Sequence, residues 1–272
     1  TIEIIMQGDY FDETLKAALE YSENTGAAML PPFDHLDVIE GQASVGVEIL
    51  NQLESPPDMI ITPVGGGGLS SGLVKYFNSY EIQFKFCEPM GGRSLFQSLK
   101  HKKLITLDYV DNFVDGAAVA RIGDQNFNIL KNQNIENVLG IPEGRICATI
   151  TEMLNIEGIV LEPAGALAID ALKDIRDQIV GKTVVCIASG GNFDFERLPD
   201  IKERALRFEG LKKYFILRMP QRPGALKDFL NLLGPNDDIA RFEYLKKSAR
   251  NFGSVLLGIE SGSVQGFDEL CK

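Results

Sequence analysis

The sequence contains few of the residues that build metal centres and disulfide frameworks. Among 272 residues there are no tryptophans, two histidines and four cysteines. The cysteines are widely separated and form no C-x-x-C pair: Cys87, Cys147, Cys186 and Cys271. With so few ligand side chains, we predict no metal site. Cys87 and Cys186 end apolar runs, where buried free thiols are expected, so a reducing, cytoplasmic location is predicted.

Basic charge and long apolar runs are also scarce. Lysine and arginine number 27 against 38 acidic residues, a net charge of −11. Nucleic-acid-binding proteins usually carry a basic face, so no nucleic-acid partner is expected. No apolar run is long enough to span a membrane, so no membrane partner is expected either. The N-terminus, TIEIIMQGD, lacks the features of a signal peptide. Because it also lacks an initiator methionine and lies in an apolar run, we expect the chain to begin within a domain.

Apolar residues make up 44% of the chain, enough to bury a core, and its length suits one or two domains. Up to about residue 205, apolar runs alternate with helical segments. The runs predicted to be strands are 1–6, 59–64, 82–87, 159–161 and 183–188. The segments predicted to be helices are about 11–25, 41–53, 69–79, 143–155 and 165–179. Runs that are apolar throughout are typical of strands buried in a parallel sheet, so residues 1–205 are predicted to form an α/β domain.

A charged helical connector at 196–213 precedes a region with a different pattern. The elements predicted beyond it are a strand at 213–220, a turn at 221–224, a helix at 225–233, strands at 238–246 and 254–260 around a turn in SARNFG (248–253), and a last helix from about 261. Apolar residues give the first of these helices one face: Leu226, Phe229, Leu230 and Leu233. The order β-α-β-β-α predicts a small α+β domain over residues 213–272 that lacks its closing strand.

The stretch PVGGGGLSSG (63–72) lies between a predicted strand and a predicted helix. Four consecutive glycines allow positive φ and a close approach of the backbone to a ligand. The helix that follows offers unpaired N–H groups, so the combination predicts a phosphate or carboxylate site. A merely tight turn is the alternative, although one or two glycines would suffice for that.

The spacing of these glycines excludes the common nucleotide motifs. A dinucleotide fingerprint, G-x-G-x-x-G, fails because Ser70 and Ser71 occupy its last position. A P-loop fails because Leu73 and Val74 stand where Lys and Ser or Thr are needed. An NAD-dependent enzyme therefore remains only a weak alternative, and a single compact phosphate is favoured.

A second glycine motif, ASGGN (188–192), follows another predicted strand. Ligands of open α/β folds bind at the carboxyl ends of the strands, so Ser189 and Asn192 are placed to supply polar groups to the same site. A plain turn is the alternative for this motif taken alone. In LEPAGALAI (161–169), Glu162 precedes a proline at a helix start, where a cap or dipole partner is the favoured interpretation.

These motifs together resemble the fold type II pyridoxal-phosphate enzymes of the tryptophan-synthase β superfamily. More narrowly, the chain is similar to the biosynthetic threonine dehydratases over nearly its whole length. The stretches that carry the resemblance are 31–50, 63–72, 87–94, 113–124, 161–168 and 187–194, with 214–230 and 237–247 similar to the ACT-like regulatory domain of that family. The resemblance implies a three-layer catalytic domain without its N-terminal part, followed by an incomplete ACT-like domain.

The resemblance also implies a cofactor and a reaction. Pyridoxal 5′-phosphate would be held by the backbone N–H groups of Gly65, Gly66, Gly67, Gly68 and Leu69, and its ring nitrogen by Ser189. A neutral hydroxyl partner, unlike an aspartate, does not keep the ring nitrogen protonated, which favours β-elimination over transamination. The implied reaction is the deamination of L-threonine to 2-oxobutanoate and ammonia, the first step of isoleucine biosynthesis. Isoleucine as inhibitor, valine as its opponent and a homo-oligomer, dimer or tetramer, are further implications.

The chain departs from the family pattern in one respect. The S-x-F-K-x-R-G motif that carries the Schiff-base lysine and the S-x-G-N-H loop are both absent from these 272 residues, so no catalytic residue is assigned. We expect part of a threonine dehydratase, incomplete at both ends. The alternative is a non-catalytic homologue that binds pyridoxal phosphate or an amino acid and lacks the lysine.

Overall fold

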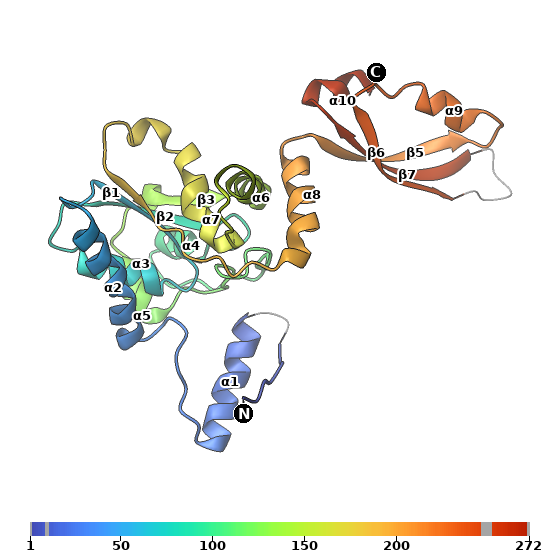
Figure 1. Cartoon of the computed structure of the whole chain (residues 1–272). Helices are drawn as coiled ribbons and strands as arrows, with labels where there is room; N and C mark the ends of the chain where they lie inside the picture. Colours follow the sequence, from blue (N-terminus) through green and yellow to red (C-terminus); the bar gives the residue numbers. More distant parts are fainter. Residues whose placement is uncertain (1, 9–10, 246–251, 271–272) are drawn as a thin grey trace. The chain divides into compact units, whose positions relative to one another are not determined.

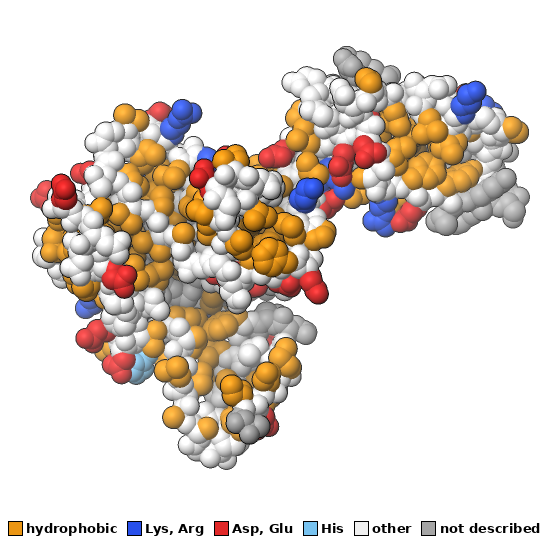
Figure 2. Space-filling view, viewed as in Figure 1, with side chains coloured by type: hydrophobic (Ala, Val, Ile, Leu, Met, Phe, Trp, Pro, Cys, Tyr) orange, Lys and Arg blue, Asp and Glu red, His pale blue; other side chains and the backbone are white. Residues whose placement is uncertain are grey.

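The computed structural model describes residues 2–8, 11–245 and 252–270. The chain forms two compact units, Thr1–Asp194 and Phe195–Lys272 (Figure 1). The boundaries predicted above, 1–205 and 213–272, remain predictions about domains. No helix in the described part of the chain is long and apolar enough to cross a membrane. Acidic and basic side chains are dispersed over the face of both units seen in Figure 2.

A parallel sheet of four strands organises the first unit, and its order is β3-β2-β1-β4. The strands are β1 (Met59–Pro63), β2 (Gln83–Pro89), β3 (Val138–Ile141) and β4 (Val184–Cys186). All neighbouring pairs are parallel, with Ile60 opposite Phe84 and Val185. Every residue of β1 is buried, as the continuous apolar run predicts. The predicted α/β class is therefore confirmed.

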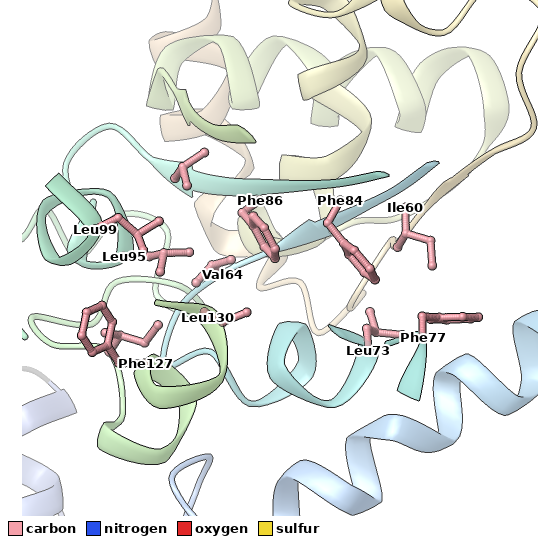
Figure 3. Packing of buried hydrophobic residues seen from close by; sticks show 12 residues of the cluster. Ile60, Val64, Leu73, Phe77, Phe84, Phe86, Leu95, Leu99, Phe127 and Leu130 are labelled. Atoms are coloured by element: carbon pink, nitrogen blue, oxygen red, sulfur yellow. The ribbon is translucent and has the colours of Figure 1, made fainter. Parts of the chain in front are cut away.

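Helices precede these strands and lie between them in the sequence. The α-helices are α1 (Phe11–Thr25), α2 (Leu36–Gln52), α3 (Gly68–Tyr76), α4 (Ser94–His101), α5 (Asp124–Leu130), α6 (Glu143–Glu152) and α7 (Pro163–Asp170). The short helical turns are Ile135–Asn137, Ala171–Lys173 and Arg176–Gln178, and a π-helical turn, Met153–Glu157, continues α6. Phe84 and Phe86 of β2 pack into a core with Leu73 of α3 and with Phe77, the C-cap residue of that helix (Figure 3). Ile60 of β1 belongs to the same core, so this packing holds both β1 and α3 in place and thereby the loop between them.

Two of the predicted strands are wrong. Residues 2–6 form no strand, and Ile2, Ile4 and Met6 are 79–90% exposed because no strand among the described residues covers them. Residues 159–161 also form no strand, since they lie in the short connection 159–162 between Gly158, at φ +67°, and Pro163, where α7 begins. Conversely, β3, α4 and α5 were not predicted from the sequence.

The second unit has the predicted order β-α-β-β-α after a connector helix. Its elements are the turn Phe195–Arg197, α8 (Leu198–Phe208), β5 (Lys212–Pro220), α9 (Ala225–Leu230), β6 (Asp237–Leu245), β7 (Phe252–Ser261) and α10 (Val264–Leu270). The antiparallel sheet has the order β5-β7-β6. The predicted turn at 248–253 lies mostly outside the described residues, which resume at Phe252. The unit is a small α+β domain.

The core of the second unit forms on one face of its sheet. Val255, Leu257 and Ile259 alternate along β7 and are at most 1% exposed, packed with Phe267 of α10. Of the apolar face predicted for α9, only Phe229 and Leu233 pack against this core, and the helix itself ends at Leu230. Two further members of that predicted face, Leu226 and Leu230, are each 44% exposed.

Candidate functional site

All six residues predicted to hold the cofactor line one pocket of the first unit. The pocket has a volume of about 220 Å³ and lies where β1 and β4 end. The predicted residues in its wall are Gly65, Gly66, Gly67, Gly68, Leu69 and Ser189. The remaining wall residues are Pro32, Phe33, Val38, Gln42, Pro63, Gly116, Ala117 and Ala164.

The glycine loop presents backbone donors that the protein does not use. Within α3 the first backbone hydrogen bond is donated by Ser71 to the oxygen of Gly67, at 2.9 Å. Among the described residues, none of the N–H groups of residues 65–69 donates a hydrogen bond. Gly67 has φ +92°, a left-handed conformation that favours glycine. Consecutive free N–H groups at a helix start form an anion-binding concavity, and a phosphate group fits it.

Side chains cannot replace hydrogen in this loop without displacing its neighbours. A Cβ atom on Gly65 would lie 2.9 Å from the Cα of Ala117, and one on Gly67 would lie 3.0 Å from the Cβ of Asn126. A Cβ on Gly66 would overlap the ring of Phe33. The glycines of this loop are therefore needed for close packing, and Gly67 also for its conformation, which is more than a tight turn alone requires.

Ser189 faces the glycine loop from the loop that follows β4. Its side chain is exposed, and within the described part of the chain its Oγ makes no hydrogen bond. The Glu162 carboxylate lies against Gly190, and the N–H of Glu162 donates to the carbonyl oxygen of Gly190 at 3.2 Å. The hydroxyl of Ser189 is thus free for a ligand, while the backbone next to it is held by Glu162.

Glu162 only partly fulfils its predicted role as a cap. It is the N-cap residue of α7 and its carbonyl accepts from the N–H of Ala166 at 3.2 Å, but its side chain makes no capping bond. Burial raises the pKa of this carboxyl group, and the negative charge of Asp115 raises it further. The side chain instead supports the loop that carries Ser189, a role that sequence reasoning missed.

Other wall residues were also missed by the sequence analysis. Phe33 comes from the segment before α2, and Gly116 and Ala117 come from the connection before α5. Their stretches belong to the motifs that carry the family resemblance, but nothing in the local pattern indicated a contact with the glycine loop. Asp34 fixes the first of these segments, because its carboxylate accepts from the N–H groups of Asp124 and Gln125 at 2.9 and 2.8 Å.

The cysteines take no part in this pocket. Cys87 and Cys147 are buried, and Cys186 is half-buried. Burial raises the pKa of the Cys87 thiol and raises that of Cys186 to about 11, so both are held as thiols rather than as thiolates. Cys271 lies outside the described residues.

A second pocket lies within the second unit, at the predicted turn QRPGAL. Its volume is about 410 Å³. The residues in its wall are Met219, Pro220, Arg222, Gly224, Ala225, Leu226, Lys227, Leu230, Phe242 and Tyr244. Leu226 and Leu230, the exposed members of the predicted apolar face of α9, are therefore part of a cavity. Its apolar side chains and its two cations provide the kinds of group that an amino acid would contact.

Two family models match the chain, one for each unit. The model described as pyridoxal-phosphate dependent enzyme matches residues 1–190. The model described as the C-terminal regulatory domain of threonine dehydratase matches residues 203–272.

Relatives of known name are similar over most of the chain. The biosynthetic L-threonine dehydratase IlvA of Bacillus subtilis (strain 168) is 47% identical over 262 residues, which is 95% of this chain and 62% of the relative. The enzyme of the same name from Staphylococcus aureus (strain bovine RF122 / ET3-1) is 46% identical over 266 residues, which is 95% of this chain and 63% of the relative. The chain thus spans less than two thirds of the length of these relatives.

Solved structures with the same fold include two threonine deaminases. The processed form of isoform 2 from Solanum lycopersicum has a TM-score of 0.67 and 35% identity, covering 74% of this chain and 59% of that one. The threonine deaminase from T.th. has a TM-score of 0.61 and 28% identity, covering 66% of this chain and 62% of that one.

Proposed function

The chain belongs to the family of pyridoxal-phosphate-dependent enzymes. We propose that its glycine loop binds the phosphate of pyridoxal 5′-phosphate and that the chain is part of an L-threonine dehydratase. The reaction is the deamination of L-threonine to 2-oxobutanoate and ammonia. The observation that carries the proposal is the row of unused N–H groups at residues 65–69 facing a free serine hydroxyl across one pocket. The names of the relatives supply the substrate.

The residues of the pocket divide the work of binding between them. The N–H groups of the glycine loop hold a phosphate dianion, and the positive end of the α3 dipole favours its charge. Ser189 holds the ring nitrogen with a neutral hydroxyl, so no acid drives a proton onto that nitrogen. Glu162 keeps the loop of Ser189 in place through its backbone hydrogen bond to Gly190. When bound, the cofactor supplies an electron sink for electrons released at the substrate Cα.

Proton removal from substrate requires a base that the described pocket does not contain. Within the described chain, no lysine lines this pocket. Lys85 lies on β2, and its Nζ donates to Asn137 Oδ1 at 3.0 Å, so this lysine stabilises the region beside the sheet and does not line the pocket. An S-x-F-K motif encoded before Thr1 would favour the enzyme, whereas its absence from the complete gene would favour a non-catalytic ligand-binding homologue.

For the second unit we propose control by an amino acid bound in the pocket at residues 219–244. Isoleucine, the end product of the pathway that the relatives' name implies, suits the apolar wall formed by Leu226, Leu230 and Phe242. Lys227 and Arg222 supply positive charge for its carboxylate, although Arg222 already pairs with Asp228 at 2.6 Å. Valine acts as the opposing ligand in this proposal. We also propose that the protein forms a homo-oligomer and is located in the cytoplasm.

A direct assay tests the proposed reaction. The protein expressed from the complete gene is incubated with L-threonine, and 2-oxobutanoate and ammonia are measured with and without added pyridoxal 5′-phosphate. Equal amounts of both products, dependent on the cofactor, support the proposal. Cofactor binding without any product contradicts the dehydratase and favours the non-catalytic homologue.

A further inference from the structure

Asn126 connects three segments of the chain beside the glycine loop. It lies on α5 and is fully buried, and its Nδ2 group donates to the carbonyl oxygen of Gly66 at 2.8 Å and to that of Phe33 at 3.2 Å. The N–H of Gly123 donates to the same Gly66 oxygen at 3.1 Å. The carbonyl group of Gly66 is therefore held by two donors, both from the start of α5.

The geometry of the peptide group turns this anchor into a constraint on the loop. A trans peptide is planar, so its C=O and N–H groups point in nearly opposite directions. With the oxygen of Gly66 held toward α5, the N–H of Gly67 points away from α5. Glycine on both sides of this bond makes a turnover of the peptide sterically cheap. A turned peptide would present an oxygen where an anion needs a donor.

The amide of Asn126 keeps its orientation at a cost. Its Oδ1 is buried and has no hydrogen-bond partner among the residues that the structure describes. Rotating the amide by half a turn would instead place Oδ1 against the carbonyl oxygens of Gly66 and Phe33. A buried acceptor without a partner is destabilising, and an apolar side chain of the same size would avoid that penalty. The amide is therefore poorly explained by stability alone and well explained by its two donated bonds.

We propose that Asn126 is a positioning residue for the phosphate cradle. By holding the Gly66 carbonyl, it keeps the N–H of Gly67 available to the phosphate and prevents the peptide between Gly66 and Gly67 from turning over. It also ties Phe33, whose ring covers Gly66, to the same helix. This inference rests on the proposed function, because it assumes that the phosphate group binds at the glycine loop.

The test compares two ligands that differ only in a phosphate group, pyridoxine 5′-phosphate and pyridoxine. Neither carries an aldehyde, so neither forms an imine with a lysine. Affinities are measured by calorimetry on the 272-residue chain. The wild-type chain should prefer the phosphorylated ligand. Asn126→Leu, which keeps the branched shape of the side chain, adds some bulk and removes both donated bonds, should weaken binding of pyridoxine 5′-phosphate roughly tenfold or more and leave pyridoxine unchanged.

Thr149→Val is the matched control for general loss of stability. It removes a different buried hydrogen bond of the first unit, from Thr149 Oγ1 to Asp170 Oδ2 at 2.6 Å, and Thr149 lines none of the pockets described above. The control should keep the wild-type preference for the phosphorylated ligand. If Asn126→Leu does not fold, Asn126→Ala makes the same comparison without the added apolar bulk.

The outcomes separate this inference from the proposed function. A wild-type chain without any preference for the phosphorylated ligand overturns both. A wild-type preference that survives in the folded Asn126 variant overturns the inference alone. An equal loss in the Thr149→Val control also overturns it, because the effect would then come from reduced stability.

Discussion

Gly67 combines two constraints in one residue. Its φ of +92° is strained for any side chain, and a Cβ there would press on Asn126 and Ile122 at 3.0 Å. Holding a residue other than glycine in that region costs about 1–3 kcal/mol. The neighbouring glycines are constrained mainly by space. Gly67 is therefore the position where both the backbone conformation and ligand binding depend most directly on the absence of a side chain.

Gly67→Asp should abolish binding of the phosphorylated ligand. The new side chain adds steric strain and places a negative charge beside the phosphate dianion. Calorimetry with pyridoxine 5′-phosphate is the measurement. Gly41→Asp is the control, because a Cβ at Gly41 meets nothing within 4 Å and the residue lies on the exposed face of α2. Normal affinity in Gly67→Asp would remove the glycine loop from the phosphate site.

Ser189→Ala should have a smaller effect on binding than on catalysis. Loss of one neutral hydrogen bond weakens ligand affinity by about 0.5–1.5 kcal/mol, since the phosphate cradle is untouched. In the protein from the complete gene, turnover of L-threonine should fall further, because the ring nitrogen loses its partner. Affinity and kcat are measured on the same preparation. Unchanged turnover would exclude Ser189 from the site.

Local sequence patterns predicted the elements that build the centre of the site. The run MIITPV and the glycines after it gave β1, the loop and the start of α3, because burial and backbone freedom are both visible in residue type. Short elements stabilised by distant contacts were missed. The strand β3 has four residues and pairs with β2 from Phe86 to Pro89, and α5 is capped by Asp34, 90 residues before Asp124.

The same distinction explains which parts of the pocket the sequence revealed. Gly65–Leu69 and Ser189 belong to glycine clusters, which are recognisable without any knowledge of the fold. Phe33 and Ala117 reach the pocket only because separate segments pack over the loop. The strand predicted at 1–6 is wrong for a related reason. An apolar run predicts burial, but it does not show whether a neighbouring strand is present to cover it.

The junction of β2 and α4 contains a fully buried acid, Glu88. Its two carboxylate oxygens accept from the N–H groups of Leu95 and Phe96 at 2.7 and 2.9 Å, so it ties the strand to the helix. Burial nevertheless raises its pKa from 4.5 to about 7, against the lowering effect of these bonds and of Arg93. The folded protein therefore favours the protonated acid more than the unfolded chain does.

This pKa predicts a loss of stability as the pH rises. Below pH 4.5 the acid is protonated in both states, and between 4.5 and about 7 only the unfolded chain releases the proton. Relative to Glu88→Gln, wild type should lose about 3 kcal/mol of unfolding free energy across that range and change no further above it. Denaturant unfolding at a series of pH values measures this.

Ser98→Ala provides the control for Glu88, since it is a buried, non-titrating change on α4, the helix to which Glu88 is bound. It removes a hydroxyl that accepts from the N–H of Ile105 at 3.1 Å. Its stability difference from wild type should not vary with pH. A Glu88→Gln difference that is equally constant would contradict the raised pKa of Glu88.

At the scale of the whole molecule, the chain consists of two units with separate cores and separate pockets. The connector helix α8 belongs with the second unit, because Lys212 of β5 forms ion pairs with Glu203 of α8 and with Glu260 of β7. Tyr214 also donates to Glu203, at 2.8 Å. A boundary before Phe195 therefore keeps every one of these bonds within one unit.

Removing residues 195–272 from the protein encoded by the complete gene should separate catalysis from control. Elimination of ammonia from L-threonine should remain, while inhibition by isoleucine should disappear. The coupling between two such sites is typically about 1–3 kcal/mol, so the loss appears as a clear shift in the isoleucine inhibition curve. Inhibition of the shortened enzyme at an unchanged isoleucine concentration would place the sensor elsewhere.

The central claim, that the glycine loop and Ser189 form one cofactor site, is tested most directly by a crystal structure of this chain with pyridoxine 5′-phosphate. The phosphate should accept hydrogen bonds from the N–H groups of residues 65–69, and the ring nitrogen should lie within hydrogen-bond distance of Ser189 Oγ. A phosphate bound away from the glycine loop, or a ring nitrogen facing another residue, would contradict the claim.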